Sequence, residues 1–257
     1  MGAGAHPLYR HGDSPVHRAP AEVKIVCLLV FVLAVVATPR EMFWPFAVYA
    51  AIVMGGWRLA GIPLRWVLPR MLIEAPFLVL ALLLPFAEGG ERVEVGGMQL
   101  SVAGLYAAWG IVVKGTLGVA AALTLAATTS AAELPAALSR LGVPAMVTSV
   151  LVLMIRYIDL LAAEAGRMRM ARISRGDSPR ALHQAFAIAT GIGALFLRSY
   201  ERGERVYRSM LSRGFDGGVP DLALIGAPPR AVPSQWILTM IPALTAVAVS
   251  VLAWVTR

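Results

Sequence analysis

Residues 102–129 read VAGLYAAWGIVVKGTLGVAAALTLAATT and contain one charged residue, Lys114. A membrane-spanning α-helix needs roughly 20 mostly apolar residues, and this stretch exceeds that length. It therefore predicts a membrane helix with one lysine near its middle.

The overall composition agrees with a membrane protein. The chain has 257 residues, of which 58% are hydrophobic and 15% are charged, and its mean hydropathy is +0.71. An ordinary soluble domain has about 25% charged residues. A chain this apolar would aggregate in water unless lipid covered much of it, so a soluble enzyme or binding domain is excluded.

Four more apolar segments are predicted to span the membrane. The first follows a polar leader of more than twenty residues and has no cleavage pattern, so it is interpreted as a membrane helix and not a removable signal peptide. The first and third are short for a full span. The four run from Val23 to Thr38, Met42 to Gly61, Met71 to Phe86 and Trp236 to Val255.

Loop charges predict the orientation of these spans. The leader and the loop around residues 58–70 carry arginines, whereas residues 87–101 are mainly acidic and glycine-rich. By the positive-inside rule the two basic segments are cytoplasmic and the acidic loop is outside. The chain then returns to the cytoplasm near Ser130.

These features divide the chain into five parts. They are a cytoplasmic leader 1–22, transmembrane helices one to four in 23–130, a cytoplasmic helical region 131–218, a linker 219–235 and a C-terminal transmembrane helix 236–257. The predicted fold is an all-α integral membrane protein with about five transmembrane helices and two long amphipathic cytoplasmic helices.

The region after Ser130 holds most of the positive charge. The net charge is +8, and residues 131–235 carry thirteen arginines and eight acidic residues. Apolar side chains there recur at three- and four-residue steps, which predicts two amphipathic helices suited to a membrane surface or a protein partner. The stripes are Met154, Ile158, Leu161, Ala165, Met168 and Ala171 in the first helix, and Phe196, Tyr200, Gly203, Tyr207 and Met210 in the second.

Both predicted helices end in the same tripeptide, Ser-Arg-Gly. One is Ser174, Arg175, Gly176, and the other is Ser212, Arg213, Gly214. Taken singly, each is explained by a glycine helix cap with an arginine near the negative end of the helix dipole. Because the motif repeats, we also expect two exposed guanidinium groups able to bind carboxylates or carbonyls of another protein.

Two charged residues fall inside predicted spans. A lysine in mid-membrane normally faces protein, a cavity or a carboxylate. Lys114 is therefore a candidate intramembrane functional residue and Glu74 a candidate mate; the alternative is a lysine that snorkels from a shifted helix.

Motifs for catalysis and metal binding are missing from the sequence. No phosphate-binding loop, no HExxH and no GxSxG occurs, so we expect no catalytic residues and no ATP hydrolysis by this chain alone. The single cysteine, Cys27, excludes an internal disulfide and a thiolate metal site.

The sequence resembles the transmembrane T components of energy-coupling-factor (ECF) transporters, in their cobalt-type, CbiQ-like branch. The segments that carry the resemblance are residues 129–135 (TSAAELP), 156–160 (RYIDL), 170–176 (MARISRG), 196–207 (FLRSYERGERVY) and 210–215 (MLSRGF), with the leader 13–18 (DSPVHR). The first Ser-Arg-Gly motif departs from many members, which have alanine at the position of Ser174.

The resemblance implies a mechanism. T components join a substrate-binding membrane (S) subunit to two cytoplasmic ABC ATPase subunits. Their paired arginine motifs lie at the ends of the coupling helices that dock into the ATPases. The implied protein is a multi-pass component of the bacterial cell membrane that binds no nucleic acid, no metal and no cofactor itself, because ATP is bound by the partners.

Several alternatives to this hypothesis stay open. The substrate implied is cobalt ion, for cobalamin biosynthesis, with nickel as another metal ion. A T subunit for a vitamin such as biotin, or one shared among several S subunits, is the nearest alternative. Rivals of other classes are a small intramembrane enzyme that uses Lys114 and Glu74, and a scaffold whose basic helices hold anionic lipid.

Overall fold

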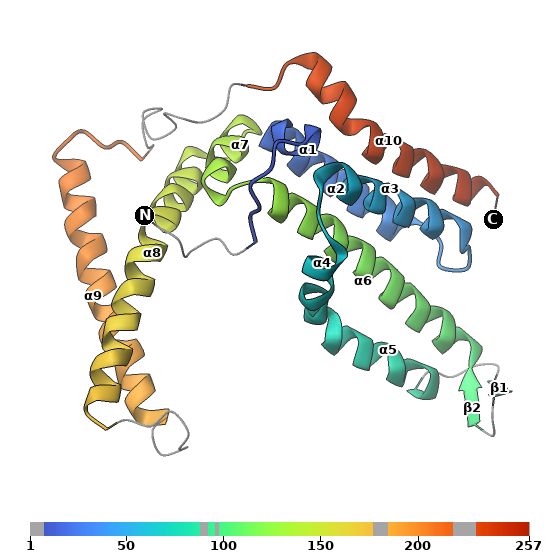
Figure 1. Ribbon diagram of the computed structural model, residues 1–257, viewed down its shortest axis with the longest axis horizontal. Helices are drawn as coiled ribbons and strands as arrows, with labels where there is room; N and C mark the ends of the chain where they lie inside the picture. The colour runs from blue at the N-terminus through green and yellow to red at the C-terminus, as the bar shows by residue number, and fades with distance from the viewer. Residues whose placement is uncertain (1–7, 88–91, 96–97, 177–184, 218–229, 257) are drawn as a thin grey trace. The chain divides into compact units, whose positions relative to one another are not determined.

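The structure is a computed structural model, and it describes residues 8–87, 92–95, 98–176, 185–217 and 230–256. It divides into two compact units (Figure 1). The apolar unit comprises Leu8–Ser130 and the C-terminal segment from Pro228, and the arginine-rich unit begins at Ala131. The regular elements among the described residues are helices apart from one short hairpin, which confirms the predicted all-α membrane fold.

The apolar unit contains all five predicted spans. Glycine in the left-handed conformation ends one helix at Gly61, and a serine side chain caps the start of another at Ser101. The hairpin pairs β1 (Arg92–Val95) with β2 (Met98–Ser101) in antiparallel register, inside the loop predicted to be external. The helices are α1 (Pro15–Arg18), α2 (Ala21–Ala37), α3 (Trp44–Ala60), α4 (Leu64–Met71), the 3-10 turn η1 (Leu72–Glu74), α5 (Ala75–Ala87), α6 (Val102–Thr128) and α10 (Pro233–Val255).

The core of the apolar unit lies where α2, α3, α6 and α10 meet. Tyr49 of α3 is fully buried there; its hydroxyl lies 2.8 Å from the Thr38 hydroxyl and donates to the Ala246 carbonyl at 3.3 Å. These hydrogen bonds satisfy polar groups far from water, where an unpaired group would be costly. They join the end of α2 to α3 and α10.

A second contact in this unit brings the backbones of α5 and α6 together at Gly104. A Cβ atom at this position would lie 2.7 Å from the Leu84 carbonyl oxygen and 2.8 Å from the Cα of Pro85. Only glycine allows this approach without movement of one helix. The residue therefore fixes how α5 packs on α6.

Within the part of the chain that the structure describes, four helical segments are long and apolar enough to cross a bilayer: Leu64–Phe86, Val102–Thr128, Ala145–Ser174 and Pro233–Val255. Three coincide with predicted spans. The other two predicted spans are α2 and α3, which are 17 residues each, or about 25 Å, at the short end of the range for a membrane helix. The remaining apolar helix, Ala145–Ser174, falls in the region predicted to be cytoplasmic.

The arginine-rich unit contains two long helices after a short entry. The 3-10 turn η2 (Ala131–Glu133) leads into α7 (Leu134–Arg140), and α8 (Ala145–Ser174) begins after Pro144. Then α9 (Ala185–Leu211) runs in the direction opposite to α8 (Figure 1). Pro135 lies in the first turn of α7, where the N–H that proline lacks would be unpaired in any case.

The predicted apolar stripes of these helices mark the face between them only in part. On α8, the stripe residues Met154 and Ile158 are exposed, whereas Leu161 of the same stripe is half-buried. Tyr157 and Glu164, which lie off the stripe, are half-buried as well. On α9, Phe196 and Tyr200 are 67% and 65% exposed, whereas Ser199, Arg202 and Val206 are half-buried. The two helices contact each other through a mixed polar face, and the apolar stripe of α9 is left open.

Candidate functional site

The first Ser-Arg-Gly motif forms the end of α8. The Arg175 and Gly176 amides donate to the carbonyls of Arg172 and Ile173 at 2.9 and 3.0 Å, and Gly176 has φ of +85°. A side chain is rarely tolerated at this φ, which explains the glycine. The helix ends at Ser174 and Arg175 is its C-cap residue, so the exposed side chain of Arg175 stands at the helix tip.

The second motif forms the end of α9 in the same way. The Arg213 and Gly214 amides donate to the carbonyls of Met210 and Leu211, each at 3.0 Å, and Gly214 has φ of +83°. The following Phe215 amide also bonds the Met210 carbonyl, and its ring makes an edge contact with Tyr207 at 6.5 Å. The cap predicted from the sequence is therefore present at both helix ends, and both arginines are exposed.

The two arginine tips, Arg175 and Arg213, lie at opposite ends of the α8–α9 pair, because the helices run in opposite directions (Figure 1). The helices meet at Glu164 and Arg198. At the helical rise, Arg175 is about 16 Å beyond Glu164, and Arg213 is about 22 Å beyond Arg198 in the other direction. A pair of tips placed this way can reach two separate partners.

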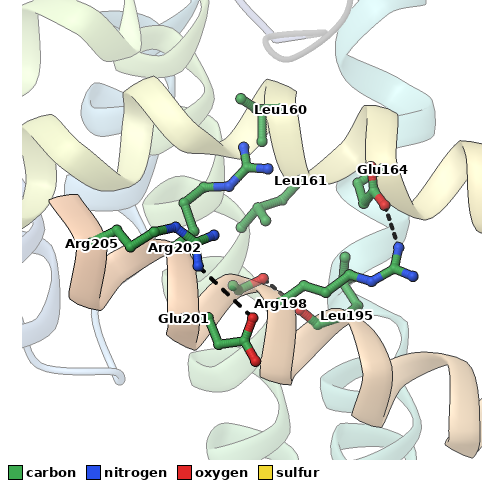
Figure 2. Close-up of a pocket in the computed structure, with 9 residues that line it drawn as sticks. Leu160, Leu161, Glu164, Leu195, Arg198, Glu201, Arg202 and Arg205 are labelled. Atoms are coloured by element: carbon green, nitrogen blue, oxygen red, sulfur yellow. Dashed lines mark hydrogen bonds and ion pairs between the residues drawn. The ribbon is translucent and has the colours of Figure 1, made fainter.

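The contact between α8 and α9 contains a small pocket of about 230 Å³ (Figure 2). Glu164 lies on one side and accepts a hydrogen bond from Arg198 at 2.7 Å. Its other lining residues are Leu160, Leu161, Leu195, Ser199, Glu201, Arg202 and Arg205. The pocket is thus bounded by three leucines, five charged side chains and one serine.

An open apolar surface accompanies the tips. On α8 the exposed residues Met146, Val150, Met154 and Ile158 recur every four positions and share one face. The exposed stripe of α9 consists of Ile192, Phe196, Tyr200, Tyr207 and Leu211. Contiguous exposed apolar side chains of this size mark surfaces that bind protein or membrane.

Lys114 and Glu74 contact different partners and not each other. The Lys114 ammonium donates to the carbonyls of Val36 and Thr38, both at 2.8 Å, at the end of α2. Glu74 is buried and accepts from the Thr116 hydroxyl at 2.9 Å. Lysine here satisfies carbonyls that a helix end leaves unpaired, which is a structural role.

The other lysine does the same at another helix end. The Lys24 ammonium, which is buried, donates to the carbonyl of Thr128 at 2.8 Å, at the last residue of α6. Nearby, the Glu22 carboxylate accepts from the Ala231 amide at 2.7 Å and so connects α2 to the start of α10.

Replacing Lys114 by methionine should destabilise the apolar unit. The change removes two hydrogen bonds from a charged donor, and we expect a loss of up to about 3–6 kcal/mol, since such bonds contribute about 1.5–3 kcal/mol each. Thermal unfolding of the purified protein in detergent measures this. An unchanged melting temperature would mean that the ammonium snorkels to water and does not hold the end of α2.

No group of three or more His, Cys, Asp or Glu side chains that could hold a metal ion occurs among the residues described. The capped arginine tips, the open apolar surface and the helical apolar unit are the features to be compared with known proteins. Residues 12–222 match the cobalt transport protein family, CbiQ. The chain belongs to this family.

Relatives of this CbiQ-family chain include three energy-coupling factor transporter transmembrane proteins, each named EcfT. The one from Thermanaerovibrio acidaminovorans is 30% identical and aligns over 95% of the chain and 92% of its own length. Those from Bacillus selenitireducens and Thermosediminibacter oceani are 27% and 24% identical, and each alignment covers 82% of the chain and 83% of the relative. The predicted membership of the T-component family is confirmed.

Membership of the CbiQ family, with its long apolar helices, makes the protein a multi-pass component of the bacterial cell membrane, as predicted. The family consists of transporter components and is not a class of enzymes. Sequence reasoning missed one residue of the contact between the two helices, Glu164 of α8. The signal for it would have been the match between an acidic residue of α8 and Arg198 at the facing position of α9.

Proposed function

We propose that this CbiQ-family chain is the coupling T subunit of an ECF-type uptake transporter for cobalt ions. The observation that supports the proposal best is the pair of identical capped tips at opposite ends of one antiparallel helix pair. A chain that had to engage two ATPase subunits at once would need two such tips, facing away from each other.

Each arginine tip would bind an acidic groove on one ATPase subunit. A guanidinium offers a planar fork of donors that matches a carboxylate with two parallel hydrogen bonds. The glycine caps set the last turn of each helix in a defined conformation, so little conformational freedom would be lost when the arginine binds. In this proposal α8 and α9 are the coupling helices, and region 131–218 is cytoplasmic.

The open apolar surface of α8 and α9 would contact the substrate-binding S subunit. Large side chains such as Phe196 and Tyr200 would be costly to leave in water, and an apolar partner would cover them. A helix pair that touches the ATPases at its tips and the S subunit along its faces would transmit movement from one to the other.

Cobalt is proposed because the matched family is described as cobalt transport protein. The ion would be recognised by the S subunit and ATP by the ATPases, so this chain would need no cofactor. The vitamin alternative differs only in the identity of the S subunit. The intramembrane enzyme gains nothing from the structure, because Lys114 and Glu74 have separate structural contacts.

The experiment that tests the proposal is purification of the tagged chain in mild detergent with mass spectrometry of the proteins that accompany it. We expect ABC-type ATPases and a small membrane protein, and the second would identify the substrate. Recovery of the chain alone from membranes in which all components are expressed would contradict the proposal and favour the lipid-scaffold alternative.

A further inference from the structure

One glutamate connects the two long helices of the arginine-rich unit. Glu164 of α8 accepts from the Arg198 guanidinium of α9 at 2.7 Å through one carboxylate oxygen. Its other oxygen accepts from Arg167, one turn further along α8. The Glu164 side chain is 20% exposed and that of Arg198 is 61% exposed, so the glutamate sits in the contact and the arginine reaches to it from the rim.

This ion pair differs from the others on α9 in what it joins. Arg205 pairs with Glu201 and Arg208 with Glu204, each four residues apart on α9 itself, and such pairs support a single helix. Arg198 instead reaches 34 positions back along the chain to α8. Beside it, the leucines of the two helices line a pocket of about 230 Å³ and do not fill it. Apolar packing is therefore thin at this contact, and the charged pair defines where the helices meet.

The position of this contact matters because the tips lie far from it. Each tip is about 16–22 Å along its helix from the Glu164–Arg198 pair. A small rotation of one helix about the contact therefore displaces its arginine tip by several times more than it displaces the contact itself. Any loosening of this contact would therefore be amplified at both tips.

We infer that Glu164, acting through Arg198, is the positioning residue that sets the mutual placement of the two arginine tips. The inference rests on the proposed function only for its consequence for coupling. Misplaced tips would still bind the ATPases, but closure of the ATPases would move the S subunit less. The placement itself is a property of this chain and is measured on it alone.

The test measures the distance between spin labels on Met170→Cys and Ser209→Cys, near the two helix ends, with Cys27→Ala as background. We expect one narrow distance distribution for the parent and a broad one for Glu164→Gln and for Arg198→Gln. The exchange of charges, Glu164→Arg with Arg198→Glu, should restore the narrow distribution. The matched control is Glu204→Gln, which breaks an ion pair within α9 and should change nothing.

Two results would overturn the inference: distributions that stay narrow in both glutamine variants, or broadening that the charge exchange does not reverse. In the assembled transporter, uptake should fall up to about fivefold in the glutamine variants with ATPases still bound, the range expected for an exposed ion pair. If the parent chain bound no ATPase, the proposed function would fail while the distance result stood.

Discussion

Reversing the charge at both helix tips, Arg175→Glu with Arg213→Glu, should abolish ATPase association and transport while the protein remains inserted in the membrane. Each change replaces a donor fork by a carboxylate that would face the carboxylates of the partner. Loss of one buried charged pair at an interface costs about 2–5 kcal/mol, so two changes should weaken association at least about a thousandfold. Co-purification of the ATPases and radioactive-ion uptake by vesicles measure the two effects.

The matched control for this experiment is Arg156→Glu with Arg169→Glu. Both arginines are exposed on α8, away from its tip, and the net charge changes by the same amount. ATPases should stay bound to this control. If the control lost them equally, long-range attraction between a basic surface and an acidic partner would replace docking at the tips. A complex retained in the tip variant would refute the docking assignment.

Replacing Gly104 by alanine should damage the apolar unit more than any other single methyl group we would add to α6. The new Cβ would sit under 3 Å from the backbone at Leu84 and Pro85, where no side chain can rotate away. Overpacking of this kind costs about 1–3 kcal/mol or more, and here α5 and α6 must separate. We expect a lower yield of monodisperse protein in detergent and a lower melting temperature.

Gly118 offers the comparison on the same helix. A Cβ there would meet no atom within 4 Å, so Gly118→Ala should be neutral or should stabilise the helix by up to about 1 kcal/mol. The two substitutions add the same atoms to α6 with opposite expected signs. Equal melting temperatures for both variants would mean that α5 does not approach α6 as closely as the structure places it.

Much of the fold followed from the sequence because the membrane imposes strong rules. A run of apolar residues as long as 102–129 has few alternatives to a helix, and the predicted segment differs from α6 by one residue at its end. The glycine caps after Arg175 and Arg213 were also predictable, since the signal is local to three residues. Such features depend on the backbone and need no knowledge of partners in space.

The contacts between helices could not be obtained in this way. Periodicity locates an apolar stripe, but it does not say whether α8, lipid or another protein covers it. The stripe with Phe196 is left open by the residues that the structure describes. The pairing of Glu164 with Arg198 depends on how two helices cross, over 34 residues of sequence. For the same reason Glu74 was the candidate partner of Lys114, although the Lys114 ammonium donates its hydrogen bonds to backbone carbonyls at the end of α2.

The chain has two lysines among 23 basic residues, and both ammonium groups hold the carbonyl end of a helix. A primary amine reacts with acylating reagents only when its nitrogen is free, so each lysine is a built-in chemical reporter. Acylation of Lys114 would time the release of the end of α2, and acylation of Lys24 the release of the end of α6, which directly precedes the arginine-rich unit. Rates of lysine acylation, measured with and without ATP in the assembled transporter, would then follow two helix ends with no substitution in the native sequence.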